Sequence, residues 1–250
     1  MNFQRIFALV KMHLKKLIRE PANLFLMILF PAVLTLVFGL SFAGIDSGIP
    51  GVSQFEVMAP GLYAYACIFI IMTVAQSFSD DREQGLLERI NTTPTSSSEF
   101  IGSHLISNTI IGLIQVIIVV ILSFLLGFQP EGTALGLLFA FIFIVFLAIC
   151  SVGLGLITAT VAKSAGAATG ISFIFILPQM FFGTFIPITP TTQMIAYFLP
   201  SYYVTDALSS IFNGAPISSL NILMDLILIV IISVVIVAVG ILLYKKYGNK

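Results

Sequence analysis

The sequence predicts an all-helical protein that crosses a membrane several times. Of its 250 residues, 58% are hydrophobic and only 9% are charged, whereas about a quarter of the residues of a soluble domain carry charge. The mean hydropathy is +1.11. Backbone amides in hydrocarbon must bond within their own segment, so apolar runs of about 20 residues are expected to be helices. The runs are continuously apolar rather than alternating, which argues against strands.

Hydropathy predicts six membrane-spanning helices with short connections between them. They are expected at Ala22–Phe42, Met58–Ser77, Leu105–Phe128, Leu135–Val161, Gly170–Ile188 and Leu226–Tyr244. We therefore expect residues 1–250 to form a single transmembrane domain. Because six is an even number, this path places both termini on the same side of the membrane.

The basic residues indicate which side that is. All eleven Lys and Arg residues fall in segments that the six-span path puts on one side: Arg5, Lys11, Lys15, Lys16, Arg19, Arg82, Arg89, Lys163, Lys245, Lys246 and Lys250. The other three connections have none. Loops rich in Lys and Arg remain in the cytoplasm. We therefore expect a multi-pass protein of the cell membrane with both termini in the cytoplasm.

The segment before the first span, residues 1–20, has the pattern of an amphipathic helix. Its apolar residues recur at helical spacing: Phe3, Ile6, Phe7, Val10, Leu14, Leu17 and Ile18. Lys11, Lys15 and Arg19 line another side, where they would meet anionic lipid headgroups. Two interpretations stay open for this interfacial helix, a membrane anchor and a docking surface for a partner protein.

The connection between the second and third spans, residues 79–100, is the most charged part of the chain. Six charged residues fall between Asp80 and Ile90, around a short apolar stripe. Ser96 and Glu99 have the spacing of a capping box, which would begin the third span. This combination favours a protein-binding element over a solvated loop.

Two motifs resemble those of a known family. The run Arg82-Glu83-Gln84-Gly85-Leu86-Leu87-Glu88-Arg89-Ile90, with Pro94 and Gly102 after it, looks like the cytoplasmic signature of type-2 ABC exporter permeases. The second motif runs from Leu177 to Pro187 and continues in Leu199-Pro200-Ser201-Tyr202-Tyr203 and Asp206-Ala207-Leu208. The chain departs from the family pattern at Leu86, where Thr is frequent, and at His104, where Lys is common.

The resemblance implies the membrane-spanning half of an exporter that works with a separate ATPase. Two permease chains, identical or different, would form a dimer that binds two ATPase subunits, and those subunits would hold the ATP and Mg²⁺. This chain itself is expected to bind no cofactor, metal or nucleic acid. The residues implied in coupling to the ATPase are Arg82, Glu83, Gly85, Glu88 and Arg89. Those implied in an external re-entrant gate, within residues 187–215, are Pro187, Pro200, Tyr202 and Tyr203.

The residues themselves also indicate an outside source of energy if the protein is a pump. The chain has no Gly-rich phosphate loop, and its predicted spans have no midplane charges of the kind that ion-coupled carriers use. Three intramembrane amides, Gln76, Gln115 and Gln179, favour contacts between helices over substrate binding. We expect a hydrophobic or amphiphilic substrate, drug-like or lipid-like, to pass along the first, second and fifth spans.

Two other classes of protein are alternatives to the exporter permease. An ion-coupled secondary transporter or channel is the runner-up, and the uncharged spans disfavour it. An intramembrane enzyme would need facing catalytic groups or metal ligands inside a span. Both histidines, His13 and His104, instead lie near the predicted cytoplasmic interface, so we do not expect this chain to be an enzyme.

Overall fold

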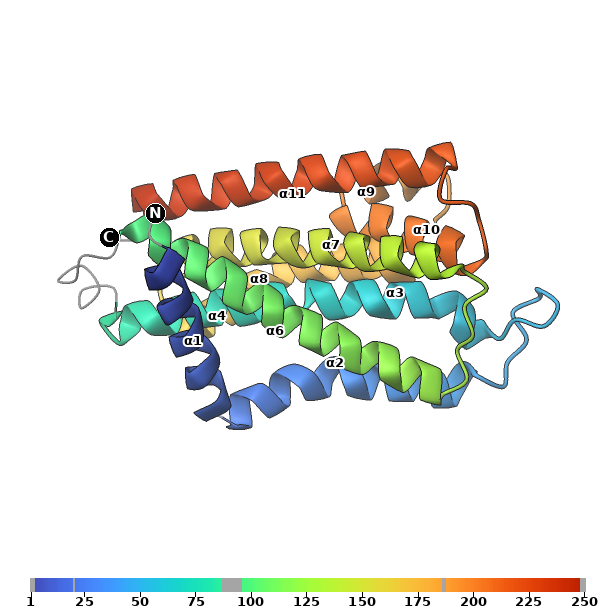
Figure 1. Ribbon diagram of the computed structural model, residues 1–250, viewed down its shortest axis with the longest axis horizontal. Coiled ribbons are helices and arrows are strands. Elements are labelled where there is room, and N and C mark those ends of the chain that lie inside the picture. The colour runs from blue at the N-terminus through green and yellow to red at the C-terminus, as the bar shows by residue number, and fades with distance from the viewer. Residues whose placement is uncertain (1–2, 20, 87–95, 186–187, 248–250) are drawn as a thin grey trace.

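The computed structural model describes residues 3–19, 21–86, 96–185 and 188–247. These residues are mainly helical and contain no strand, as the composition predicts. Long helices run side by side along one axis, and both termini lie at the same end (Figure 1). The helices are α1 (Phe3–Arg19), α2 (Pro21–Phe42), α3 (Gln54–Ile68), α4 (Ile70–Glu83), α6 (Ser97–Leu125), α7 (Ala134–Val161), α8 (Ala165–Met180), η1 (Phe181–Phe185), α9 (Gln193–Ala196), α10 (Pro200–Phe212) and α11 (Leu220–Tyr247).

Five helical stretches of the described residues are long and apolar enough to cross a membrane. They are Gln54–Glu83, Glu99–Leu125, Ala134–Val161, Ala165–Phe185 and Leu220–Tyr244. They correspond to the second to sixth predicted spans. The first predicted span coincides with α2, Pro21–Phe42, in which the described residues give a shorter apolar stretch, Ile28–Phe42. The chain is therefore a helical membrane protein with five such stretches among its described residues, and the first predicted span, with the total of six, stays a prediction.

One end of the bundle, which we call the basic end, gathers the segments that the charges predict to share a side. It holds α1, the end of α4, the start of α6, the turn between α7 and α8, and the end of α11 (Figure 1). The connections at the opposite end, residues 43–53, 126–133 and 213–219, have no Lys or Arg. The helix order therefore matches the predicted distribution of charge.

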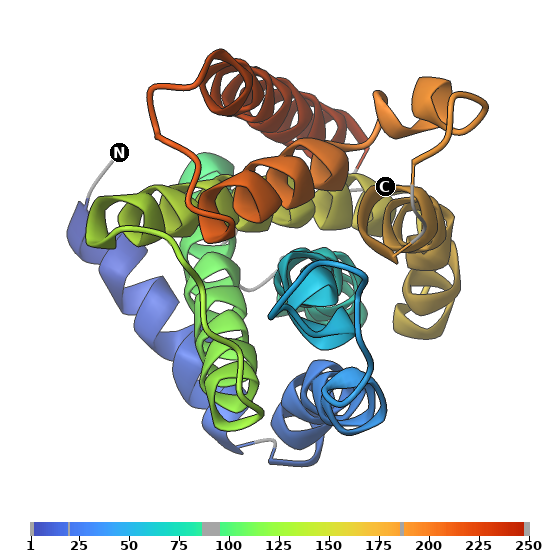
Figure 2. The same cartoon turned by 90° about the vertical axis from the view of Figure 1, so that its right-hand side faces the viewer.

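The second span is the centre of the bundle. It consists of α3 and α4, which meet at Phe69, and 83% of its most apolar stretch is buried. Figure 2 looks along the bundle and shows α3 surrounded by other helices. The helix continues beyond the predicted end at Ser77 to Glu83, so a charged segment forms the last turn of the most buried span.

The N-terminal segment forms one amphipathic helix, α1, as its pattern predicts. It crosses the bundle steeply near the basic end and packs mainly on α6 (Figure 1). Ile6, Val10 and His13 are buried, whereas Phe3 and Phe7 are exposed. An exposed apolar row on a helix that also carries cations suits the membrane interface.

The helices α3 and α6, which begin the second and third predicted spans, each start with a capping box. The predicted capping box at α6 is confirmed: the Glu99 N–H donates to Ser96 Oγ at 3.2 Å, and the Ser96 N–H donates to Glu99 Oε2 at 3.0 Å. The same device, which the sequence analysis missed, begins α3 with Ser53 and Glu56. Each box satisfies amides that the first turn of a helix would otherwise leave unpaired.

The segment between η1 and α11 contains two short helices, α9 and α10, among its described residues. Helix α10 has 13 residues, about 20 Å at 1.5 Å per residue, so it cannot cross a hydrocarbon layer of about 30 Å. It packs against α3, α7 and α11, and its end meets the loop before α7, where the Glu131 N–H donates to the Phe212 carbonyl at 2.8 Å. That this region forms a re-entrant segment of the membrane domain stays a prediction.

Small residues bring α7 close to the central helix α4. Ser151, Gly155 and Ala159 are spaced by four and are all buried. A Cβ atom added to Gly155 would lie 2.6 Å from Val74 Cβ and 2.8 Å from the Ile71 carbonyl oxygen. Close approach of this kind allows dispersion contacts to hold helices together in lipid.

We predict that Gly155→Ala destabilises the protein, because the added methyl group overpacks the α4–α7 contact at a cost of about 1–3 kcal/mol. The better helix propensity of Ala offsets up to about 1 kcal/mol of this cost. Thermal unfolding in mild detergent measures this change. The matched control is Gly170→Ala on α8, where an added Cβ meets no atom within 4 Å. Equal midpoints for the two variants would contradict the close α4–α7 packing.

Candidate functional site

A cluster of ionisable side chains is buried at the basic end, where α1, α4 and α6 meet. At its centre, the Asp81 side chain is only 1% exposed. The ammonium of Lys16 donates to Asp81 Oδ1 at 2.8 Å. On the other carboxylate oxygen, Oδ2, His104 Nε2 lies at 3.1 Å and His13 Nδ1 at 3.9 Å. We call His13, Lys16, Asp81 and His104 the Asp81 cluster.

Helical periodicity positions each member. His13 and Lys16 are three residues apart on α1, so they share a face of that helix. On α4, Phe78 lies three residues before Asp81, and its ring stacks on that of His104 with the centroids 3.9 Å apart. Two aromatic rings and a neighbouring imidazole, whose centroid is 3.7 Å away, thus hold His104 in place. His104 is thus fully enclosed, whereas His13 and Lys16 also border a cavity.

The surroundings of His13 favour its neutral form. The pKa of His13 is lowered from 6.5 to about 3, mainly by burial and also by the nearby His104 and Lys16, although the Asp81 carboxylate acts to raise it. Desolvation outweighs the carboxylate because an imidazolium loses its hydration when it is buried. His13 is therefore uncharged at neutral pH.

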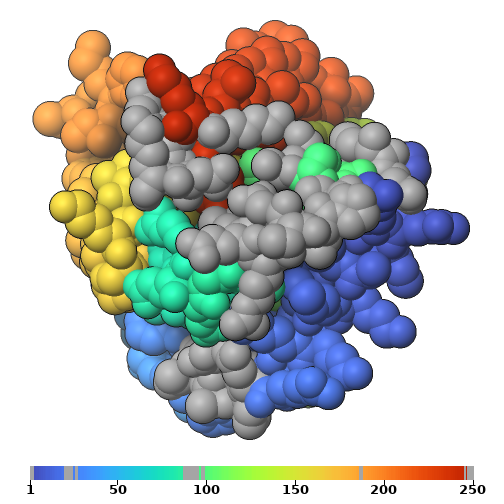
Figure 3. Space-filling model, turned by 90° about the vertical axis from the view of Figure 1, so that its left-hand side faces the viewer, coloured from blue at the N-terminus to red at the C-terminus, as the bar shows by residue number. Residues whose placement is uncertain are grey.

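Immediately beyond the cluster, the end of α4 is attached to the turn between α7 and α8. The Arg82 guanidinium donates to the Ala162 carbonyl, and Glu83 Oε1 accepts a hydrogen bond from the Ala165 N–H at 2.9 Å. Glu83 thereby places a negative charge at the N-terminus of α8, where the helix dipole favours it. In Figure 3 the end of α4 (teal) lies between α1 (blue) and the region of this turn (yellow).

The structure brings three of the five predicted coupling residues to this place. Arg82 and Glu83 contact the α7–α8 turn, and Gly85 follows α4 with a φ of 66°, a left-handed conformation that favours glycine. The other two, Glu88 and Arg89, lie outside the described residues. A role in binding an ATPase stays a prediction for all five.

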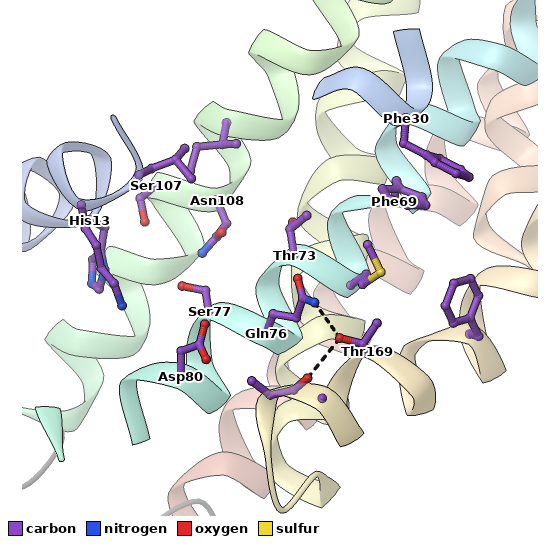
Figure 4. A pocket seen from close by; sticks show the side chains of 17 residues that line it. His13, Phe30, Phe69, Thr73, Gln76, Ser77, Asp80, Ser107, Asn108 and Thr169 are labelled. Atoms are coloured by element: carbon purple, nitrogen blue, oxygen red, sulfur yellow. Dashed lines mark hydrogen bonds between the residues drawn. The ribbon is translucent and has the colours of Figure 1, made fainter. Parts of the chain in front are cut away.

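A cavity of about 600 Å³ opens beside α4, toward the basic half of the bundle. Helices α1, α2, α4, α6 and α8 contribute to its wall (Figure 4). One part of the wall is polar, with Thr73, Gln76 and Asn108, and another is aromatic, with Phe30 and Phe69. The volume lies in the range of about 300–1,000 Å³ that small-molecule sites occupy. The cavity therefore suits a molecule with both polar and apolar parts.

One of the predicted intramembrane amides joins two walls of this cavity. Gln76 Nε2 donates to Thr169 Oγ1 at 2.6 Å, which links α4 to α8 (Figure 4). The prediction that such amides serve contacts between helices is confirmed for Gln76. Gln179 is buried and donates within its own helix to the Phe175 carbonyl at 3.3 Å.

Three of the four predicted external-gate residues lie together at the start of α10. Pro200 is the first residue of that helix and is buried. The Tyr203 hydroxyl donates to the Tyr197 carbonyl at 2.6 Å, and the Tyr202 ring lies against it, with centroids 5.2 Å apart. Tyr202 also lines a smaller cavity of about 290 Å³. Pro187 lies outside the described residues, and a gating role stays a prediction.

The Asp81 cluster is the feature that sequence reasoning missed. The sequence places both histidines near the same interface but does not indicate that they meet. It shows Asp81 only as one of several charged residues in the connection between the second and third spans. The available signal was the rarity of His and buried Asp next to spans, since ionisable groups at such positions are expensive and usually functional. Because His13, Asp81 and His104 are far apart in the sequence, their contact cannot be inferred from it.

An all-helical chain with several membrane-length helices, a basic end and a cavity among its spans is a polytopic membrane domain of the transporting kind. The family model described as ABC-2 type transporter matches residues 4–213, and the chain belongs to this family. The match confirms the resemblance seen in the sequence. The family's membrane domain is a transport subunit that lacks the ATPase. A search of curated proteins finds no match.

We predict that Lys16→Met destabilises the protein by about 1–3 kcal/mol, because it leaves the buried Asp81 carboxylate without its cation. The control is Lys15→Met, the same change at the adjacent, exposed position. Thermal unfolding in detergent compares the two. If both variants unfold at the wild-type midpoint, the Lys16–Asp81 pair does not hold α1 in place.

Proposed function

We propose that this protein is the permease subunit of an ATP-binding cassette exporter. It moves a hydrophobic or amphiphilic molecule, drug-like or lipid-like, out of the cell with energy from ATP hydrolysed by a separate subunit. The observation that carries the proposal is the cavity of about 600 Å³ within the part of the chain that the transporter family covers. Its wall includes the first, second and fifth predicted spans, the path expected for substrate.

The contacts at the basic end support a route from an ATPase to this cavity. Helix α4 leads directly into the predicted coupling segment, and Arg82 and Glu83 attach its end to the start of α8. Both helices border the cavity and are joined again by Gln76 and Thr169. A displacement of the coupling segment would therefore move two walls of the cavity together.

The distribution of charge supports the orientation. The basic end would face the cytoplasm, with both termini, because Lys and Arg concentrate on that side. The surface formed there by α1, the end of α4 and the α7–α8 turn would receive one ATPase subunit, so that a dimer of permease chains would bind two (Figure 3). A second permease chain would complete the transport path, as the family resemblance implies.

The first test is purification from native membranes in mild detergent, with mass spectrometry of the proteins that accompany the chain. We expect an ATPase subunit in a one-to-one ratio. Recovery of the chain reproducibly alone would contradict the exporter proposal and favour a self-sufficient carrier or channel.

We predict that the double charge reversal Arg82→Glu, Glu83→Lys lowers substrate-stimulated ATPase activity of the complex roughly tenfold. This corresponds to about 1.4 kcal/mol, within the usual range of coupling free energies. The reason is that both contacts with the α7–α8 turn are lost. Assays on complexes reconstituted in lipid measure the change.

The matched control is Glu131→Lys, a charge reversal at the opposite end of the bundle, which should leave the activity unchanged. Membrane insertion and thermal unfolding show whether each variant is folded. A folded double variant with wild-type stimulation would refute the coupling role.

We predict that Gly166→Leu reduces stimulation by amphiphilic dyes and phospholipids several-fold. Gly166 lines the cavity and an added Cβ meets no atom within 4 Å, so the new side chain fills the cavity without disturbing the fold. The control is Ala167→Leu, an exposed position on α8 that does not line the cavity, which should behave as wild type. Equal stimulation of both variants would remove the cavity from the transport path.

A further inference from the structure

Several polar atoms of the Asp81 cluster have no hydrogen-bond partner among the described residues, although they are buried. They are His13 Nε2, Asp81 Oδ2 and both ring nitrogens of His104. His104 Nε2 lies 3.1 Å from Asp81 Oδ2, but the geometry is not that of a hydrogen bond. Buried polar groups are nearly always satisfied. Asp81 Oδ2 and His104 Nε2 are both orphaned and face each other at 3.1 Å, and His13 Nδ1 lies 3.9 Å from the same oxygen, so these three atoms point to an additional ligand between them.

The donor atoms have the chemistry and the spacing of a transition-metal site. One ring nitrogen of each histidine and one carboxylate oxygen all lie within 4.8 Å of one another. Two ligands at about 2.1 Å from a tetrahedral Zn²⁺ are about 3.4 Å apart, close to the 3.1 Å and 3.9 Å that separate Asp81 Oδ2 from the two histidines. Two histidines and a carboxylate are a common set of ligands for Zn²⁺.

We propose that His13, Asp81 and His104 bind a divalent transition-metal ion, with Zn²⁺ the best fit. Three protein ligands leave a fourth position for water. His13 borders the cavity of about 600 Å³, which offers the ion a path to the site. The ion would join α1 to α4 and α6, and the inference does not depend on the proposed transport function.

The surroundings of the cluster fit this role. Lys16 holds Asp81 Oδ1 at 2.8 Å, which orients the carboxylate and directs Oδ2 toward the histidines, as the outer partners of metal ligands do. The Lys16 side chain is 31% exposed, so solvent screens part of its repulsion of a cation. Phe78 and Phe100 pack on His104 and form an apolar shell on that side.

The test uses the full chain, purified in mild detergent with a histidine-free tag, stripped with EDTA and then dialysed against Zn²⁺. Elemental analysis should find one zinc ion per chain. His13→Gln and His104→Ala should each bind at least tenfold more weakly, because each loses a ligand. The chain has no histidine other than these two, so the histidine variants report on this site alone.

The control is the double variant Cys67→Ala, Cys150→Ala, which removes both cysteines and should bind zinc as the wild type does. Replacement of Zn²⁺ by Co²⁺ should give the visible absorption of a four-coordinate site, and His13→Gln should abolish it. Added Zn²⁺ should also raise the unfolding midpoint of the wild type but not of His13→Gln.

The wild type decides the question even if a variant fails to fold. No zinc above the level of protein-free detergent, or zinc retained in full by a folded variant lacking both histidines, would overturn the proposal. Zinc that disappears with the cysteines would overturn it as well, since the ligands would then be elsewhere.

Discussion

A carboxylate that is buried in a helical membrane protein must be accompanied by cations or hydrogen-bond donors, because an isolated charge in an apolar medium is very costly. Asp81 imposes this requirement at the end of α4, the most buried span. Lys16 from α1 meets it through a hydrogen-bonded ion pair with Oδ1, and His104 from α6 lies 3.1 Å from the other carboxylate oxygen. Asp81 thus contacts both the N-terminal helix and the third predicted span at the end of the second.

The same helix end connects the basic end with the interior. Residues 81–83 face three different neighbours in succession: Asp81 faces α1 and α6, Arg82 the end of α7, and Glu83 the start of α8. The helical rotation of about 100° per residue makes this possible, since consecutive side chains point in different directions. Helix α4 is therefore attached on all sides at one level, and the cavity lies along its next turns.

Much of the fold could be predicted because hydrocarbon limits the backbone to a few solutions. Long apolar runs became helices, and the capping residues Ser96 and Glu99 marked the start of α6. The end of the second span was placed too early, at Ser77, because hydropathy falls where charges begin, although the helix continues to Glu83. Side-chain polarity is a poor guide to a helix end when the charged residues find partners inside the protein.

The sequence by itself determined the helical class, the order of the membrane helices, the basic end and the family, because apolar length and charge are properties of the chain read in order. Only the tertiary structure decided which residues meet. His13, Asp81 and His104 come from three helices, and their contact depends on helix crossings and rotations that no local pattern encodes. The cavity was decided in the same way, since α2, α4, α6 and α8 leave space between them only in the packed bundle.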